Sequence, residues 1–207
     1  IINKNKKNFE IILLTANKDY KTLLKQTKLF NVKNVILNDI KSYKKFKKII
    51  KNNNINIYNN FKSLDKIFKK KIDYTMSSIS GLEGLMPTHQ IIKFTKIIAI
   101  ANKEAIICGW NLILKEIKKH KTKFIPIDSE HFSIWDILRN KSRSTVDKVL
   151  ITASGGPLLN KPLNKIYKTK LYEALNHPNW NMGKKISIDS ATMMNKVFEI
   201  IEAKNIF

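Results

Sequence analysis

Arginine is nearly absent from this strongly basic sequence. The 207 residues include 39 lysines and arginines against 16 acidic residues, a formal net charge of +23, yet Arg139 and Arg143 are the only arginines. Because arginine is the side chain that contacts phosphates and bases in a bidentate way, surfaces selected for nucleic acid usually keep some of it. The composition therefore favours a drift toward lysine, asparagine and isoleucine on solvated faces. A polyanion-binding surface is the less favoured alternative.

Cysteine and long apolar runs are scarce as well. The single cysteine, Cys108, excludes an internal disulfide and fits a reducing compartment. The most apolar stretch, residues 91–114, is interrupted by Lys93, Lys96 and Glu104, so we predict no membrane-spanning helix. No segment resembles a signal peptide. An apolar content of 43% is enough for one large core or two small ones.

Short β-rich runs alternate with helical patterns up to about residue 128. The runs are rich in Ile, Val and Tyr, and they cover residues 9–16, 34–39, 54–59, 74–79, 96–102 and 123–128. Apolar residues recur every three or four positions between them, in residues 20–30, 42–52, 63–71, 82–94 and 104–120. This alternation predicts an α/β fold with a doubly wound parallel sheet, which binds ligands at the carboxyl ends of its strands.

The pattern changes after about Lys141. We expect one more strand at residues 148–154, then a helical stretch and a loop at 177–185. A strand at 185–189 should follow, leading into a helix that begins at Ser190. We place a domain boundary near Asp128, which divides the chain into residues 1–127 and 128–207.

Asp128 and Glu130 are the first candidates for chemistry. In extended backbone, a spacing of two places both carboxylates on one side, where they repel each other unless a cation lies between them. Mg²⁺ or Mn²⁺ suits such oxygen ligands, whereas a solvated pair of loop carboxylates is the alternative. Glu199 is a possible third ligand, because it shares one helix face with Asn195 and Lys196.

Other segments carry weaker signals. We expect the opposite face of that last helix to fill the core through Met194, Val197, Phe198 and Ile201. The run TASGGP at 152–157 has a serine and two glycines, which let backbone amides approach an anion. Lys103 lies at the start of a helix, where the dipole disfavours a cation. Trp180 and Met182 lie in a loop flanked by proline and glycine and fit a lid over a ligand.

Four motifs together resemble one enzyme family. They are IANKEA at 100–105, IPIDSEH at 125–131, TASGGP at 152–157, and HPNWNMGKKISIDSATMMNK at 177–196 followed by Glu199. This sequence closely resembles the 1-deoxy-D-xylulose 5-phosphate reductoisomerase family, which uses NADPH and a divalent metal in the non-mevalonate isoprenoid pathway. The match runs in family order along the whole chain. It implies a Rossmann-like NADPH-binding domain over 1–127 and an α+β catalytic domain over 128–207.

The resemblance also implies roles for individual residues. The implied ligands of Mg²⁺ or Mn²⁺ are Asp128, Glu130 and Glu199, which together with Lys103 form the expected catalytic set. The implied substrate contacts are Lys103, Ser129, Glu130, Ser154, His177, Trp180, Met182, Ser190, Asn195, Lys196 and Glu199. Ser154, Ser190 and Asn195 are expected to surround the phosphate. The implied NADPH contacts are Asn17, Lys18, Asp19, Asn102, Glu104 and Gly183.

The resemblance implies reduction and rearrangement of 1-deoxy-D-xylulose 5-phosphate to 2-C-methyl-D-erythritol 4-phosphate by a homodimer in the bacterial cytoplasm or a plastid-type organelle. Two features depart from the family. The glycine-rich phosphate loop after the first strand and the C-terminal helical domain are missing, so we expect a piece of a longer chain. We also note Asn17 and Asp19 where the family more often has Gly and Asn. A truncated, inactive pseudoenzyme and, less favoured, a basic nucleic-acid-binding protein remain the alternatives.

Overall fold

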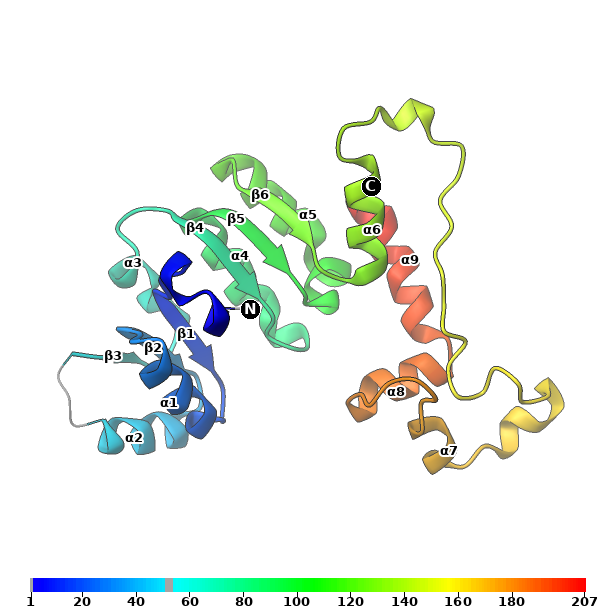
Figure 1. Ribbon diagram of the computed structural model, residues 1–207, viewed down its shortest axis with the longest axis horizontal. Helices are drawn as coiled ribbons and strands as arrows, with labels where there is room; N and C mark the ends of the chain where they lie inside the picture. Colours follow the sequence, from blue (N-terminus) through cyan, green and yellow to red (C-terminus); the bar gives the residue numbers. More distant parts are fainter. Residues whose placement is uncertain (1, 51–53) are drawn as a thin grey trace. The chain divides into compact units, whose positions relative to one another are not determined.

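The computed structural model describes residues 2–50 and 54–207, and it confirms the α/β class with parallel strands (Figure 1). The chain divides into two compact units, Ile1–Lys71 and Ile72–Phe207. The strands form two three-stranded parallel sheets, ordered β1-β2-β3 and β4-β5-β6. The boundary predicted near Asp128 lies inside the second unit and stays a prediction.

The first unit is a small α/β layer structure. Its strands are β1 (Leu13–Ala16), β2 (Asn34–Leu37) and β3 (Asn56–Tyr58), and its helices are α1 (Tyr20–Leu29), α2 (Ile40–Ile49) and α3 (Leu64–Ile67). Its core is built from Leu23, Val35, Leu37 and Phe46. An aspartate after each of the first two strands caps the next helix, since Asp19 accepts from the Thr22 amide at 3.0 Å and Asp39 from the Ser42 amide at 2.8 Å. The helix expected over 63–71 is shorter in the structure, where it is the single turn of α3.

The second unit begins with another parallel sheet. Its strands are β4 (Ile72–Ser77), β5 (Thr95–Ile100) and β6 (Lys123–Pro126), connected by α4 (Leu85–Ile91) and α5 (Lys103–His120). The end of the central strand is fully buried at Ile98 and Ala99, and α5 turns Ile106 and Ile113 into the same core. Asn102 caps α5 by accepting from the Ala105 amide. The turn from β5 into α5 is therefore closely fixed.

The rest of the second unit is helical and irregular. It contains α6 (Ser129–Leu138), α7 (Leu171–Leu175), α8 (Lys184–Ala191) and α9 (Met194–Ile206). Helix α9 packs against α5, α6 and α8, so residues from widely separated parts of the sequence meet along it (Figure 1). This packing positions the candidate site.

The strand expected at 148–154 does not form. Residues 146–156 belong to no sheet, and Val149 and Leu150 are exposed to 47% and 81%. A strand needs a neighbour for its backbone N–H and C=O groups. Within the described residues no strand pairs with this segment.

The strand expected at 185–189 is also wrong, because these residues lie in helix α8. Ile186 and Ile188 are two residues apart, which is the spacing of side chains on one face of a strand. Burial follows a helical spacing instead, with Ser187 and Ala191 facing inward. Lys185 and Asp189 form an ion pair at 2.8 Å with the same spacing of four. Consequently Ser190 lies near the end of α8 and does not begin a helix, since α9 starts at Met194.

Helix α9 buries its polar face rather than the apolar face that we expected to fill the core. Met194, Val197 and Ile201 are 38–43% exposed, whereas Glu199 and Glu202 are 2% and 1% exposed. The helix therefore turns carboxylates toward the rest of the unit.

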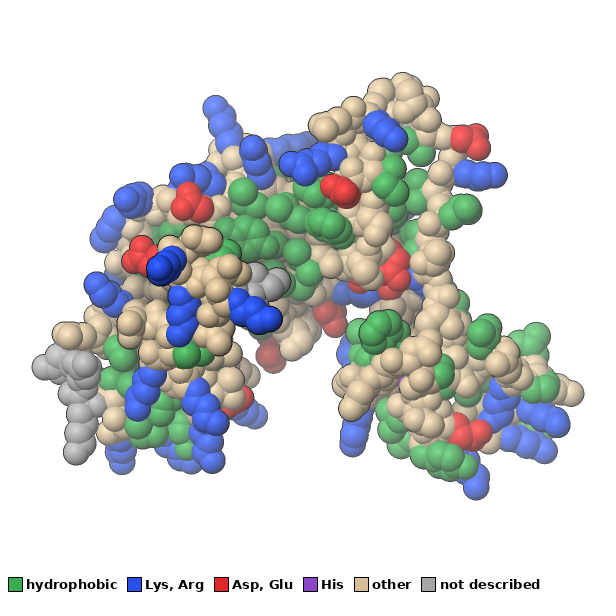
Figure 2. Space-filling model, in the orientation of Figure 1, with side chains coloured by type: hydrophobic (Ala, Val, Ile, Leu, Met, Phe, Trp, Pro, Cys, Tyr) green, Lys and Arg blue, Asp and Glu red, His purple; other side chains and the backbone are tan. Residues whose placement is uncertain are grey.

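Two further observations concern hydrophobicity and surface charge. No helix among the described residues is long and apolar enough to cross a membrane. Figure 2 shows lysines and arginines scattered over the visible surface of both units rather than gathered in one patch. This distribution is what solvated lysine faces produce.

Candidate functional site

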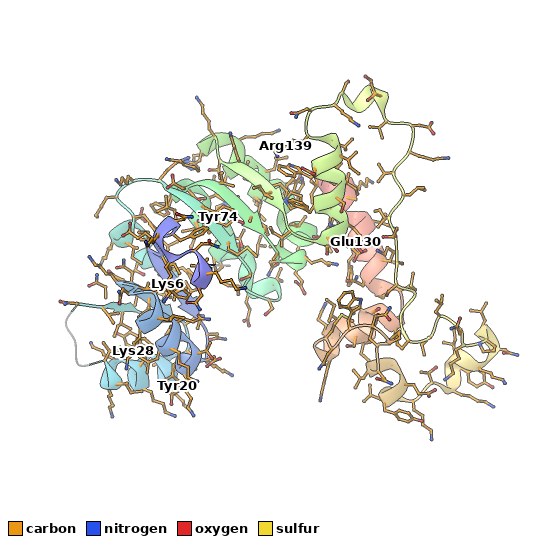
Figure 3. All side chains as sticks on the ribbon, viewed as in Figure 1. Lys6, Tyr20, Lys28, Tyr74, Glu130 and Arg139 are labelled. Atoms are coloured by element: carbon orange, nitrogen blue, oxygen red, sulfur yellow. The ribbon has the colours of Figure 1, made fainter. Side chains whose placement is uncertain are left out.

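Three carboxylates converge where α6 meets α9. Asp128 is the residue before α6, Glu130 lies in the first turn of α6, and Glu199 lies on α9. Figure 3 shows Glu130 at the start of α6, beside α9. One oxygen from each carboxylate lies within 4.8 Å of the others. Three carboxylate oxygens at this separation are a donor set for a hard divalent cation.

The local reason for this convergence differs from the predicted one. Asp128 and Glu130 do not share a side of an extended strand, because β6 ends at Pro126 and Glu130 is already helical. A helix N-terminus projects its first residues in one direction, and α9 brings Glu199 to them. The predicted grouping thus forms through a different backbone geometry.

Two lysines neutralise part of this negative charge. The Lys103 ammonium lies 3.3 Å from Asp128 Oδ2 and 3.5 Å from Glu199 Oε1, and it donates to Asn195 Oδ1 at 2.8 Å. Lys196 pairs with Glu199 Oε2, and its Nζ lies 3.4 Å from Glu130 Oε1. The position of Lys103 at a helix start, unfavourable by the dipole alone, is explained by these acidic neighbours.

The environment separates the acidities of the two carboxylates at the start of α6. Burial raises the pKa of Asp128, and a hydrogen bond with Glu130 raises it further. Burial also acts to raise the pKa of Glu130, but hydrogen bonds from Asp128 and Ser129 outweigh it and lower that pKa to about 2. Glu130 is therefore ionised throughout the physiological range, as a cation ligand requires.

Sequence reasoning missed a second polar layer behind these carboxylates. His131 is 1% exposed, and its Nε2 lies 2.8 Å from the Glu199 carbonyl oxygen. Its Nδ1 lies 3.7 Å from Asp128 Oδ1 and 3.9 Å from Glu202 Oε2. The spacings of three, from Asp128 to His131 and from Glu199 to Glu202, were the available signal, because they place each pair on one helix face.

A cleft of about 690 Å³ lies in front of the carboxylates. It is lined by every predicted site residue of the second unit, namely Asn102, Lys103, Glu104, Asp128, Ser129, Glu130, Ser154, His177, Trp180, Met182, Gly183, Ser190, Asn195, Lys196 and Glu199. This volume is typical of a site for a small molecule. The second unit therefore brings these residues to one place.

Some of these side chains are already engaged within the protein. Asn102 accepts from the Ala105 amide and donates to the Gly81 carbonyl at 2.8 Å, so its side chain is occupied as a cap. Ser129 is exposed and donates to Glu130 Oε2 at 2.7 Å. Asn195 bridges Lys103 and Glu199. These three side chains line the cleft and are already hydrogen-bonded to other groups of the protein.

The segment predicted to form a lid lines the cleft with Trp180 and Met182. Trp180 is 65% exposed, and Met182 is half-buried. The following helix α8 is held to α5 by Lys185, whose Nζ lies 3.4 Å from Glu104 Oε1. An exposed aromatic side chain that borders a cleft is free to cover a ligand.

The other three predicted cofactor residues belong to the first unit. Asn17, Lys18 and Asp19 follow β1 and are exposed. Hydrogen bonds from Thr22 lower the pKa of Asp19, as expected for a helix cap. An acidic residue at this position therefore has a structural reason, independent of any ligand.

Comparisons with known proteins point to one family. A sequence model described as 1-deoxy-D-xylulose 5-phosphate reductoisomerase matches residues 1–109, and one described as the C-terminal domain of that enzyme matches residues 124–207. A curated protein of this name from Pelagibacter ubique is 62% identical over 100% of the chain, which covers 54% of that relative. One from Wolbachia pipientis wMel is 42% identical over 100% of the chain and 53% of its own length.

Solved structures agree with these sequence matches. The reductoisomerase from Zymomonas mobilis in complex with NADPH is 34% identical with a TM-score of 0.88, over 99% of this chain and 52% of that one. A DOX-P reductoisomerase in complex with NADPH, fosmidomycin and magnesium is 32% identical with a TM-score of 0.87, over 100% of this chain and 54% of that one. The chain spans about half the length of the relatives that it matches.

Proposed function

Because this chain belongs to the 1-deoxy-D-xylulose 5-phosphate reductoisomerase family, we propose that it supplies the metal- and substrate-binding part of such an enzyme. The proposed reaction converts 1-deoxy-D-xylulose 5-phosphate to 2-C-methyl-D-erythritol 4-phosphate with NADPH. One observation carries the proposal: three carboxylates and two lysines from α5, α6 and α9 converge on one cleft. A neighbour in complex with NADPH, fosmidomycin and magnesium supports the same chemistry.

Asp128, Glu130 and Glu199 would hold the divalent metal. Their oxygens fit Mg²⁺ or Mn²⁺, which prefer carboxylate ligands. A divalent ion held there would supply Lewis-acid polarisation of the substrate carbonyl oxygen. The low pKa of Glu130 keeps this ligand charged, and the lysines that contact the triad offset its negative charge.

The remaining cleft residues would bind and enclose the substrate. Lys103 and Lys196 place ammonium groups beside the carboxylates, where they can contact substrate oxygens. We assign the phosphate to Ser154, Ser190 and Asn195, since binding energy far from the reacting carbons orients them. Trp180 and Met182 would close over the substrate and exclude water.

NADPH would supply the hydride that completes the reaction. We assign Asn102, Glu104 and Gly183 to its nicotinamide end, and Asn17, Lys18 and Asp19 to the adenosine 2′-phosphate end. Lys18 is the cation of this second group. The proposed division of labour gives residues 1–127 to NADPH binding and 128–207 to catalysis.

We also infer a homodimer located in the bacterial cytoplasm. The matching relatives named above are bacterial, which supports this location over a plastid-type organelle. Size-exclusion chromatography with light scattering of the active enzyme tests the dimer.

A chimeric enzyme tests the proposed function. These 207 residues would replace the matching segment of the Pelagibacter ubique relative, with which they share 62% identity. We expect this chimera, with Mn²⁺ and 1-deoxy-D-xylulose 5-phosphate, to oxidise NADPH and form 2-C-methyl-D-erythritol 4-phosphate. The unaltered relative is the positive control. A folded chimera that binds neither Mn²⁺ nor substrate would instead favour an inactive pseudoenzyme.

A further inference from the structure

A second group of metal-ligand side chains lies behind the three carboxylates assigned to the catalytic metal. It consists of Asp128, His131 and Glu202, which we call the inner set, whereas Asp128, Glu130 and Glu199 are the outer set. One nitrogen or oxygen atom from each inner side chain lies within 4.8 Å of the others. The residues come from the start of α6 and from α9, which pack against each other (Figure 1). Asp128 thus belongs to both sets.

Two oxygen atoms of the inner set are buried without a hydrogen-bond partner. Within the described part of the chain, no group forms a hydrogen bond with Asp128 Oδ1 or Glu202 Oε2. The Lys103 ammonium contacts the other oxygen of Asp128 at 3.3 Å, and it lies 3.8 Å from Glu202 Oε2, beyond hydrogen-bond distance. Glu202 is 1% exposed. Because burying a carboxylate oxygen without a partner is costly, this arrangement favours a bound cation.

The third atom of the inner set, His131 Nδ1, also presents a lone pair. His131 Nε2 lies 2.8 Å from the Glu199 carbonyl oxygen, which can only accept a hydrogen bond. Nε2 therefore carries the proton of the neutral ring. Nδ1 faces Asp128 Oδ1 at 3.7 Å and Glu202 Oε2 at 3.9 Å. A histidine that donates its other N–H to a backbone carbonyl is the usual arrangement of a metal ligand.

A metal ion suits these three lone pairs better than a water molecule does. One water has two protons and cannot donate to all three atoms. Tetrahedral Zn²⁺, with bonds of about 2.0–2.2 Å, holds its ligand atoms roughly 3.3–3.6 Å apart. The separations of 3.7 and 3.9 Å require only a small contraction to reach this range. A cavity of about 120 Å³, lined by all three side chains, leaves room for a fourth ligand such as water.

The two sets differ in the ion that they favour, and their charges limit them to one ion at a time. The inner set contains an imidazole nitrogen, which suits Zn²⁺, whereas the outer set has only carboxylate oxygens, which suit Mg²⁺ and Mn²⁺. The two sets contain four carboxylates, and the contacting Lys103 and Lys196 offset two of their charges. One divalent ion balances the remainder, and a second would leave excess positive charge in a buried region.

We propose that Asp128, His131 and Glu202 form a Zn²⁺ site whose occupation excludes the catalytic metal, because both sites use Asp128 as a ligand. Zn²⁺ in the inner set draws the Asp128 carboxylate away from the outer set and thereby inhibits the enzyme. The inner site stands on its own donor atoms and goes beyond the proposed function. Only the inhibition rests on that function, which assigns Mg²⁺ or Mn²⁺ to the outer set.

Three nearly isosteric variants of the 207-residue chain separate the two sites. Calorimetry measures the affinities for Zn²⁺ and Mn²⁺, and circular dichroism checks that each variant is folded. Glu202→Gln should lose about 10–100-fold or more in Zn²⁺ affinity, and far less in Mn²⁺ affinity because the outer set keeps its carboxylates. Glu130→Gln should show the reverse pattern. Asp128→Asn should weaken the binding of both ions.

Controls exclude zinc bound elsewhere on the chain. All measurements use a Cys108→Ser background, because an exposed thiol is itself a Zn²⁺ ligand. His120→Gln is the matched control, since His120 Nε2 also lies beside a carboxylate, at 3.2 Å from Glu116 Oε2. It should keep the parental Zn²⁺ affinity. X-ray absorption at the zinc edge should detect one imidazole ligand in the parent and in His120→Gln, and none in His131→Gln.

Competition between the ions tests the exclusion. Zn²⁺ should release bound Mn²⁺, detected by the electron paramagnetic resonance of the free ion, at a lower concentration in the parent than in Glu202→Gln. Equal losses of Zn²⁺ affinity in Glu202→Gln and Glu130→Gln, or zinc without an imidazole ligand, overturn the inner site. Simultaneous binding of both ions overturns the exclusion. A parent chain that binds Zn²⁺ through His131 but binds no Mn²⁺ contradicts the proposed function and leaves the inner site supported.

Discussion

At the residue scale, Glu202 is the side chain with the most unusual environment. It is 1% exposed, and its Oε2 has no hydrogen bond from the described residues, although the Lys103 ammonium lies 3.8 Å away. Burial is the main cause that raises the pKa of Glu202 from 4.5 to about 8, and the nearby Asp128 and Glu199 add to it. The folded protein therefore holds this proton more tightly than the unfolded chain does.

This raised pKa predicts a pH-dependent stability. The contribution of Glu202 is fully present below the unfolded pKa of 4.5 and is lost as the pH rises through about 8. With EDTA present, we expect Glu202→Gln to show a smaller fall in Tm than the parent from about pH 5 to about pH 9. Glu173→Gln is the matched control, because its folded pKa is lowered and its effect lies at acidic pH. Parallel Tm profiles for parent and Glu202→Gln would exclude a protonated Glu202.

Trp180 gives a second prediction at this scale. It is 65% exposed and lines the cleft, and its printed hydrogen bond runs from its backbone N–H to His177 rather than to a carboxylate. In the chimeric enzyme, Trp180→Ala should weaken fosmidomycin binding about 10-fold or more through lost aromatic burial. Calorimetry should find Mn²⁺ affinity unchanged. Loss of Mn²⁺ affinity in this variant would contradict the assignment of Trp180 to the lid.

At the element scale, the turn at 154–156 depends on glycine. Gly156 has φ +65°, and a Cβ there would lie 2.6 Å from the Ser190 carbonyl oxygen at the end of α8. Both the left-handed backbone and the contact disfavour any larger residue. This turn and α8 can therefore approach as closely as they do only with glycine at this position.

Gly156→Ala should consequently destabilise the 207-residue chain by about 1–3 kcal/mol, the usual range for a non-glycine residue held in this region. Gly183→Ala is a matched control, because nothing lies within 4 Å of its added Cβ and its φ is −61°. Urea unfolding followed by circular dichroism measures both variants. Equal stability of the two would show that α8 does not pack on this turn.

The same scale shows where the sequence was informative. Strands β2 and β5 were predictable because each is a short apolar run that a parallel sheet buries, as at Val35 and Ile98. The segment at 185–189 was not, because its alternating isoleucines resemble a strand while tertiary packing selects the helical spacing of Ser187 and Ala191. The spacing of Asp128 and Glu130 suggested a cation site with Glu199 as a possible third ligand, and the resemblance implied the complete set. His131 and Glu202 were missed, because a spacing of three from Asp128 and from Glu199 indicates a shared helix face but does not show that the side chain is buried.

At the scale of the whole molecule, the chain spans about half the length of its relatives. Its first glycine is Gly81, so β1 is not followed by a glycine-rich loop that could hold a pyrophosphate. We expect the 207-residue chain alone to bind NADPH at least about 10-fold more weakly than the chimeric enzyme and to show no turnover. Fluorescence titration compares the two proteins. NADPH oxidation by the 207-residue chain with substrate and Mg²⁺ would contradict this expectation.

The central claim is that Asp128, Glu130 and Glu199 together hold one metal ion, and Mn²⁺ affinity in the chimeric enzyme with fosmidomycin tests it most directly. Calorimetry would compare Asp128→Asn, Glu130→Gln and Glu199→Gln with Lys196→Ala. Each carboxylate variant removes a charged ligand and should lose about 10–100-fold or more in affinity, since even changes behind the ligands reach that range. Lys196→Ala should retain the ion, because it removes a cation that pairs with Glu199 and Glu130. Parental Mn²⁺ affinity in the three carboxylate variants, or its loss in Lys196→Ala alone, would contradict the account.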